Sequence, residues 1–190
     1  MKYSVGAAAV LVIAFLTALS GVNEYFFYAA FVVLQFMVLA TAWNILGGYA
    51  GYVNFGTAAF FAIGSYTAVV LFKWLGAPLA VQIVAASAVS GLLGFGVGLL
   101  TLRLRGIFFA IATVAIIFIM ETMMMNWRYV GGATGLQLLR PDVLQPFASY
   151  TRMLFFVMAL LAVIAVSVAR YVQVSWIGRG LRAIRPRTPS

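Results

Sequence analysis

The chain has no cysteine, no histidine and only three acidic residues among its 190. Without cysteine there is no disulfide framework and no thiol chemistry. Without histidine as well, the usual zinc sites, the Ser-His and Cys-His nucleophiles and histidine-bound haem are excluded. The acids, Glu24, Glu121 and Asp142, lie far apart in the sequence, which argues against paired carboxylates for acid–base catalysis. We therefore expect a protein that is not an enzyme and holds no metal.

Charge of either sign is scarce, because charged residues make up 8% of the chain and hydrophobic residues 65%. In soluble proteins about 25% of the residues are charged and about 45–50% are hydrophobic. A domain of this size also leaves much of its surface exposed to solvent. We therefore expect lipid, rather than water, to surround the outer surface of the protein. The net charge of +9 does not indicate nucleic acid, because most basic residues flank apolar runs or lie near the C-terminus. The C-terminal ones are Arg170, Arg179, Arg182, Arg185 and Arg187.

Six apolar runs are long enough to cross a membrane, at roughly 20 residues each. In hydrocarbon every backbone polar group needs an internal partner, so each run should be helical. A β-barrel is excluded because its strands alternate apolar and polar residues. The sequence predicts an all-α polytopic membrane protein with about six transmembrane helices. The runs are Val5–Val22, Phe26–Leu46, Thr57–Leu75, Leu79–Leu102, Ile107–Met125 and Met153–Ala169.

The first run follows Lys2 and ends near Ala18-Leu19-Ser20, which resembles a signal cleavage site. An uncleaved first helix is the favoured interpretation, because the run is long and the rest of the chain is itself membrane-embedded. With the N-terminus inside, eight of the twelve basic residues fall inside. The positive-inside rule then predicts that both termini are cytoplasmic. The largest external loop is Trp127–Tyr150, which is either a docking surface for an external partner or a plain connection.

The fourth run carries small residues at four-residue spacing, such as Ser87/Gly91 and Ser90/Gly94/Gly98. Small residues let helix backbones approach closely inside a membrane, so this pattern predicts helix packing.

Glu121 is the one acid inside an expected membrane helix, which makes it a candidate for the translocation path. It also lies less than about two turns before the expected helix end, so its carboxylate could instead reach the outer interface. The neighbouring methionines suit an adaptable packing surface.

The segment from Trp176 to Arg185 has apolar residues on one face and arginines at three-residue spacing on another. This pattern predicts a short basic amphipathic helix after the last span. It would either lie against anionic lipid or dock a partner protein. We expect residues 1–172 to form the transmembrane domain and 173–190 a cytoplasmic segment and tail. The candidate docking residues are Trp176, Arg179, Leu181, Arg182 and Arg185.

Asn44 to Gly56 is a glycine-rich, uncharged segment between the second and third runs. A simple cytoplasmic loop would attract basic residues, whereas irregular backbone at membrane depth is tolerated where it lines a cavity. We predict a broken or re-entrant segment lining a solute path, with a tight turn for helix packing as the alternative. The predicted path residues are Gly47, Gly48, Gly51 and Gly56 as hinges, Asn44, Asn54 and Thr57 as polar lining, and Glu121.

Four ordered blocks carry a family resemblance: NILGGYAGYVNFGTAAFFAIGSYTA, TLRLRGIFFAIATVAI, NWRYVGGATGL and SWIGRGLRAIR. Together they resemble the branched-chain amino acid ABC transporter permeases of the LivM-like type. The resemblance spans most of the chain, from about Asn44 to Arg185.

The resemblance implies a membrane-spanning permease subunit of an ABC importer in the bacterial inner (plasma) membrane. The implied partners are a second permease subunit, two cytoplasmic ATP-binding subunits, which bind the ATP, and a periplasmic substrate-binding protein. The subunit itself would need no cofactor. The implied substrates are leucine, isoleucine and valine.

The chain departs from the family pattern at two places. Thr57 stands where many relatives have histidine or glutamine. After Arg185 the chain reads PRTPS, whereas relatives continue into a cytoplasmic helix and further spans. The resemblance therefore predicts a truncated permease. Two alternatives stay open: a stand-alone channel or secondary carrier, and a small membrane protein that transports nothing.

Overall fold

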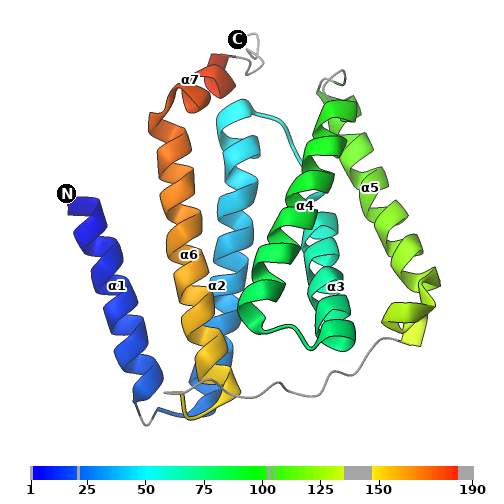
Figure 1. The fold of residues 1–190 in the computed structure, drawn as a ribbon. Helices are drawn as coiled ribbons and strands as arrows, with labels where there is room; N and C mark the ends of the chain where they lie inside the picture. Colours follow the sequence, from blue (N-terminus) through cyan, green and yellow to red (C-terminus); the bar gives the residue numbers. More distant parts are fainter. Residues whose placement is uncertain (1, 21, 102–103, 105, 135–146, 184–190) are drawn as a thin grey trace. The chain divides into compact units, whose positions relative to one another are not determined.

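The computed structural model describes residues 2–20, 22–101, 104, 106–134 and 147–183, and over these ranges it is helical without strands (Figure 1). Five helices are long and apolar enough to cross a membrane, so the protein is an all-α polytopic membrane protein. The first apolar run is also helical, but its described apolar part, Gly6–Leu19, is shorter than a full span, so the expected count of six is not confirmed. The main helices are α1 (Lys2–Leu19), α2 (Glu24–Asn44), α3 (Thr57–Leu75), α4 (Leu79–Thr101), α5 (Ile107–Asn126), α6 (Tyr150–Val174) and α7 (Trp176–Ala183). The short helices are η1 (Ile45–Ala50), η2 (Arg128–Val130) and η3 (Gly132–Thr134).

The described helices divide between two compact units. Unit 1 contains α1, α2, η1, α6 and α7, and α6 contacts both α1 and α2 (Figure 1). Its centre is Phe27, which is fully buried and meets Phe155 edge-on with ring centroids 5.5 Å apart. Ala14, Ala18 and Ala159 complete this cluster, and their small side chains let the three helices pack closely.

Unit 2 contains α3, α4 and α5, with α3 contacting the other two. The α3–α4 contact uses part of the expected small-residue face. Ser90 Oγ donates to the Phe60 carbonyl at 3.2 Å, and a Cβ added to Gly64 would lie 3.1 Å from that hydroxyl oxygen. A Cβ at Gly94 would lie 3.7 Å from the Phe60 ring, whereas one at Gly91 would meet nothing within 4 Å. Ser90 and Gly94 therefore form the packing face, and Gly91 faces away from it.

The glycine-rich segment is broken, but the break begins later than the sequence predicts. Helical hydrogen bonding does not stop at Asn44, because the chain passes directly into the π-helix η1 and remains helical to Ala50. Gly51 then adopts a left-handed conformation with φ of 73°, and the chain has no regular structure until α3 begins at Thr57. A π-helix widens the turn by one residue and occurs mostly as a local feature, often at functional sites.

Candidate functional site

The first four predicted path residues belong to unit 1. Gly47 and Gly48 lie within η1, where a Cβ at Gly47 would come within 2.8 Å of the Trp43 ring and one at Gly48 would contact the Asn44 side-chain oxygen. These glycines therefore leave room for side chains of the preceding turn. Of the four predicted hinge glycines, Gly51 alone has a positive φ. Asn44 is exposed and makes no capping hydrogen bond through its side chain.

The remaining predicted path residues belong to unit 2. Asn54 Oδ1 accepts a hydrogen bond of 2.8 Å from the Gly56 amide, which closes a local turn before α3. Gly56 is buried, and a Cβ there would lie 3.1 Å from Asn54 Oδ1 and 3.6 Å from the Thr113 carbonyl. The turn therefore packs directly on α5. Thr57 is half-buried at the first position of α3.

Thr113 is a residue that sequence reasoning missed. It is 3% exposed, and its hydroxyl accepts a hydrogen bond of 3.2 Å from the Phe55 amide while donating to the Ala110 carbonyl. It therefore joins the irregular segment to α5. The available signal was a hydroxyl side chain in the middle of an apolar run.

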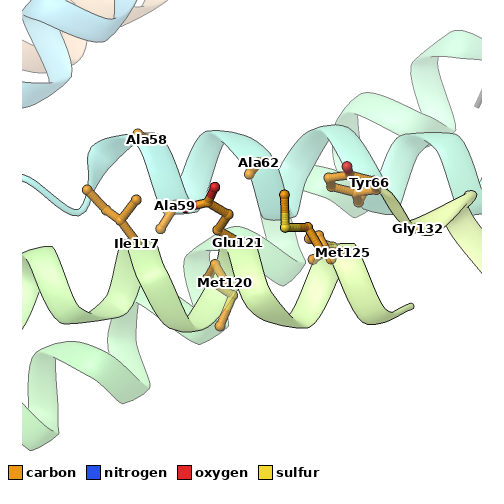
Figure 2. A pocket seen from close by; sticks show the side chains of 10 residues that line it. Ala58, Ala59, Ala62, Tyr66, Ile117, Met120, Glu121, Met125 and Gly132 are labelled. Atoms are coloured by element: carbon orange, nitrogen blue, oxygen red, sulfur yellow. The ribbon is translucent and has the colours of Figure 1, made fainter. Parts of the chain in front are cut away.

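A cavity of about 480 Å³ lies between α3 and α5 (Figure 2). The α3 side is built from small residues and one tyrosine, and the α5 side from longer side chains, chiefly methionines. Small residues at four-residue spacing leave space that flexible methionines only partly fill. The lining residues are Ala58, Ala59, Ala62 and Tyr66 of α3, Ile117, Met120, Glu121, Met124 and Met125 of α5, and Gly132 of η3.

Of the described residues that line this cavity, Glu121 is the only charged one. Figure 2 shows its side chain reaching from α5 toward α3, between Ile117 on one side and Met125 on the other. It is exposed, and no hydrogen bond or ion pair joins it to another described residue. It lies five residues before the end of α5 at Asn126, or about 7.5 Å along the helix axis. A carboxylate in such an apolar setting favours a cationic ligand.

Among the predicted path residues, Glu121 alone lines this cavity. Thr57 immediately precedes Ala58, the first cavity residue of α3, while Asn54 and Gly56 belong to the turn before it. The residues that line the cavity on α3 therefore follow directly, in the sequence, after the second half of the glycine-rich segment. The first half, with Asn44, lies in unit 1.

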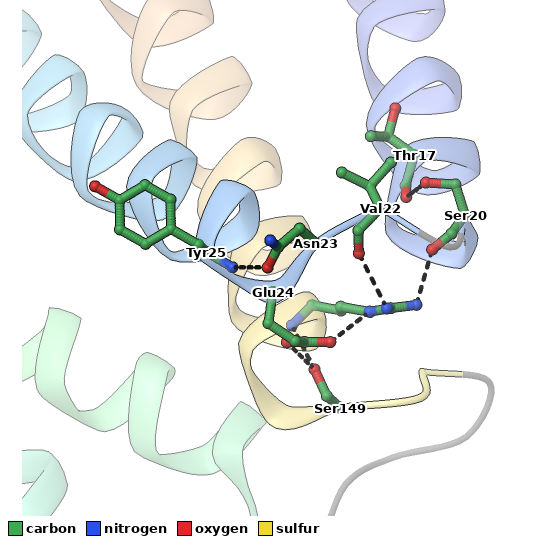
Figure 3. A network of polar contacts seen from close by, with 8 residues as sticks. Thr17, Ser20, Val22, Asn23, Glu24, Tyr25 and Ser149 are labelled. Atoms are coloured by element: carbon green, nitrogen blue, oxygen red, sulfur yellow. Dashed lines mark hydrogen bonds and ion pairs between the residues drawn. The ribbon is translucent and has the colours of Figure 1, made fainter.

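A cluster of charged and polar residues lies at the start of α6, in unit 1 (Figure 3). Arg152 Nε donates to Glu24 Oε1 at 2.8 Å, and its two terminal nitrogens donate to the carbonyls of Ser20 and Val22 at 2.8 and 3.3 Å. Ser149 Oγ donates to the other Glu24 oxygen at 2.8 Å. This cluster joins the end of α1 to the starts of α2 and α6.

The same arginine also lies 5.1 Å above the centroid of the Phe27 ring, at a cation–π distance. Both members of the ion pair therefore have partners within the protein. Because this end of unit 1 holds the end of α1 and the start of α6, the start of α1 and the end of α6 both point toward the opposite end of the unit (Figure 1).

The basic amphipathic helix is present as α7. Trp176 is 74% exposed, Arg179 is exposed and Leu181 is half-buried. Arg185 and the side chain of Arg182 lie outside the described residues.

The helix α7 contacts both the end of α6 and the π-helix η1. Gly178 is buried at this junction, and a Cβ there would meet the backbone carbonyls of Val172 and Gln173. The absence of a side chain at Gly178 lets α7 fold back closely on α6.

Comparisons with known proteins identify a family and one relative. Residues 25–186 match the protein family described as branched-chain amino acid transport system, permease component. The chain is also 31% identical over 102 residues to the high-affinity branched-chain amino acid transport system permease protein LivM of Salmonella typhimurium. That alignment covers 53% of this chain and 24% of the relative, so the chain aligns with about a quarter of the relative's length. No solved structure matches. Because the family match extends over most of its length, the chain belongs to the branched-chain amino acid transport permease family.

Proposed function

We propose that this chain acts as a permease subunit of an ABC importer for branched-chain amino acids in the bacterial inner membrane. The observation that carries the proposal is the family match from residue 25 to residue 186, together with a cavity between two membrane-spanning helices inside that range. The name of the Salmonella relative supports the same substrate class.

The cavity between α3 and α5 is the proposed part of the solute path. Its apolar lining, which includes Ala62 and Ile117, suits a branched aliphatic side chain. Glu121 supplies the negative charge that an α-ammonium group needs once it leaves water. Because Glu121 has no partner among the described residues, it needs to break no protein contact before it binds.

The glycine-rich segment, including Gly51 and Gly56, is the proposed hinge that precedes α3, one wall of this path, in the chain. Gly51 already has a positive φ, and Gly56 packs against α5 without a side chain. Asn54 and Thr57 contribute the polar groups of the same stretch. Gly47 and Gly48, which lie in η1, and Asn44, which directly precedes η1, are proposed to belong to the same hinge segment.

The proposed partners follow the transport-system architecture: a second permease subunit, cytoplasmic ATP-binding subunits, which carry the ATP, and a periplasmic binding protein. Both termini of this chain are proposed to be cytoplasmic. The concentration of arginines near the C-terminus supports that orientation, as does the position of α7 at the same end of unit 1 as the start of α1.

The helix α7 is the proposed docking element for an ATP-binding subunit. Trp176 and Arg179 are exposed there, and the opposite side of the helix contacts α6 and η1. Gly178→Ala would push α7 away from α6, so we expect several-fold less ATP-binding subunit to co-purify. Gly180→Ala is the matched control, because a Cβ there meets nothing within 4 Å. Equal recovery with both variants would contradict the docking role.

The function as a whole is tested by uptake of radiolabelled leucine into proteoliposomes that contain this chain with its transport-system partners. We expect uptake that requires ATP and that unlabelled isoleucine and valine reduce. Leucine flux through this chain alone, without ATP, would favour a channel or secondary carrier instead. No uptake with all partners present would contradict the proposal directly.

A further inference from the structure

A second cavity of unit 2, of about 690 Å³, lies where α3 ends beside η2. It is lined by Lys73 and Trp74 of α3 and by Arg128 and Tyr129 of η2. Among the described residues, it shares no lining residue with the cavity that contains Glu121. Two cationic and two aromatic side chains therefore form a site that the proposed solute path does not use.

Direct contacts join three of these residues, and Arg128 precedes one of them, Tyr129, in the chain. Lys73 Nζ donates to the Tyr129 carbonyl at 3.4 Å, and the rings of Trp74 and Tyr129 have centroids 5.7 Å apart. The lysine contact is long and uses one of the three donors of the ammonium group. The lysine ammonium and the Arg128 guanidinium therefore keep several N–H groups for a ligand.

The charge of the cavity has no counterpart in the described part of the chain. Neither Lys73 nor Arg128 forms an ion pair with a described residue, since the ion pair found there joins Arg152 to Glu24. Glu121, the described acid of this unit, lines the other cavity. Two like charges that share a hollow repel each other, so an anion placed between them would relieve that repulsion.

The position of the cavity relative to the membrane surface indicates which kind of anion it binds. Lys73 and Trp74 lie in the last turn of α3, a membrane-length helix of 19 residues. Trp74 and Tyr129 are 64% and 62% exposed, and the adjacent Leu75 is 71% exposed. Tryptophan and tyrosine concentrate at the boundary between hydrocarbon and water, where lysine and arginine reach the phosphate layer.

We propose that this cavity binds the phosphate of an anionic phospholipid. Lys73 and Arg128 contact the phosphate oxygens, and Trp74 and Tyr129 pack against the glycerol and the first acyl carbons. Guanidinium and ammonium groups are the side chains that bind phosphate most strongly. An acidic protein surface would match the charges but would leave the exposed rings at the bilayer boundary without a role.

The test uses the 190-residue chain in phosphatidylcholine vesicles that contain brominated phosphatidylglycerol, with brominated phosphatidylcholine as the reference lipid. Bromine quenches tryptophan fluorescence at short range, so a bound lipid gives quenching beyond that of the bulk bilayer. We expect excess quenching by phosphatidylglycerol. Trp74→Phe should remove that excess while the other three tryptophans still respond to bulk lipid.

Two double variants identify the groups that bind. Lys73→Gln with Arg128→Gln should weaken the preference for phosphatidylglycerol about 25-fold, because each of the two basic residues near the surface contributes roughly a fivefold preference. Lys73→Arg with Arg128→Lys keeps both charges and should retain the preference. If the glutamine variant lost helicity by circular dichroism, the Trp74→Phe result and the charge-conserving variant would still decide the question.

Three outcomes would overturn the proposal. One is an excess of quenching that survives in the glutamine variant or in Trp74→Phe. Another is an excess that soluble glycerol phosphate abolishes, which would identify a site for free phosphate. The third is binding of an acidic peptide in pure phosphatidylcholine vesicles, dependent on the same two cations and without any lipid preference, which would identify a protein partner.

Discussion

The charged residues of the two units differ in how their charges are satisfied. In unit 1, Arg152 and Glu24 bind each other at 2.8 Å, and neighbouring carbonyls and a hydroxyl take up further donors and acceptors. In unit 2, Glu121 and Arg128 line cavities and have no ion partner among the described residues. Removing a charge whose partners lie within the protein destabilises the fold, because those partners are left unpaired, whereas a charge held beside a cavity is available to a ligand.

This difference separates roles that the sequence alone does not distinguish. Glu24 and Glu121 are both acids close to the ends of apolar runs, and Arg128 and Arg152 are both arginines near such ends. Their neighbours in space, rather than in sequence, decide which of them bind within the protein. The same substitution should therefore lower stability when it is made in the unit 1 charge cluster, and lower transport or ligand binding instead when it is made at a cavity of unit 2.

The largest expected effect on stability comes from Arg152→Ala. The side chain is 14% exposed and makes three hydrogen bonds, so its loss should cost about 2–3 kcal/mol. For a chain of this size that corresponds to a fall in the thermal midpoint of about 5–10 °C, measured by circular dichroism in detergent.

Arg128→Ala is the matched control, since this arginine is exposed and makes no ion pair with a described residue. Its midpoint should stay within about 2 °C of the wild type, as for most exposed substitutions. A midpoint that fell equally in both variants would remove the distinction between the two arginines.

Ser149→Ala tests a smaller part of the same cluster. The hydroxyl accepts from the Arg152 amide at the start of α6 and donates to Glu24, so its loss should cost about 1 kcal/mol. Ser87→Ala removes a hydroxyl that donates only to the Ile83 carbonyl of its own helix and should change stability by less than half as much. Denaturant or thermal unfolding of the two variants, side by side, checks this difference.

Thr113→Val sharpens the comparison from within unit 2, because Thr113 is a polar residue of that unit with partners of its own. Valine keeps the shape but leaves the Phe55 amide without an acceptor, so we expect a loss of up to about 1 kcal/mol. Thr122→Val makes the same chemical change at an exposed position of α5 and should have no measurable effect. If Thr122→Val were the more damaging, the assigned role of Thr113 would be wrong.

The sequence predicts the helices of this fold closely, because apolar runs and their lengths are local properties. The expected run Thr57–Leu75 is identical to α3, and Ile107–Met125 differs from α5 by one residue. The apolar run begins at Met153, whereas α6 begins at Tyr150, because Ser149 extends the helix through a cap that adds no hydrophobicity. Apolar content locates a span, and capping side chains decide where it ends.

The contacts between helices could not be predicted in the same way. Arg152 and Glu24 are 128 residues apart, and a single sequence contains no sign that they meet. The same holds for the approach of Thr113 to the irregular segment after Gly51. The sequence singles out Glu121 because a lone acid in an apolar helix is conspicuous, but the cavity beside it depends on the alanines of α3, which look like ordinary packing residues.

The most direct test of the account is the initial rate of ATP-dependent leucine uptake by the assembled transporter, normalised to folded protein, for Glu24→Gln and Glu121→Gln. Both variants replace a carboxylate by its uncharged isostere. We expect Glu121→Gln to lower the rate about tenfold or more, the effect of losing one charge-assisted contact to the ammonium group, and Glu24→Gln to stay within about twofold. Equal rates for the two variants, or a greater loss with Glu24→Gln, would contradict the assignment of Glu121 to the solute path.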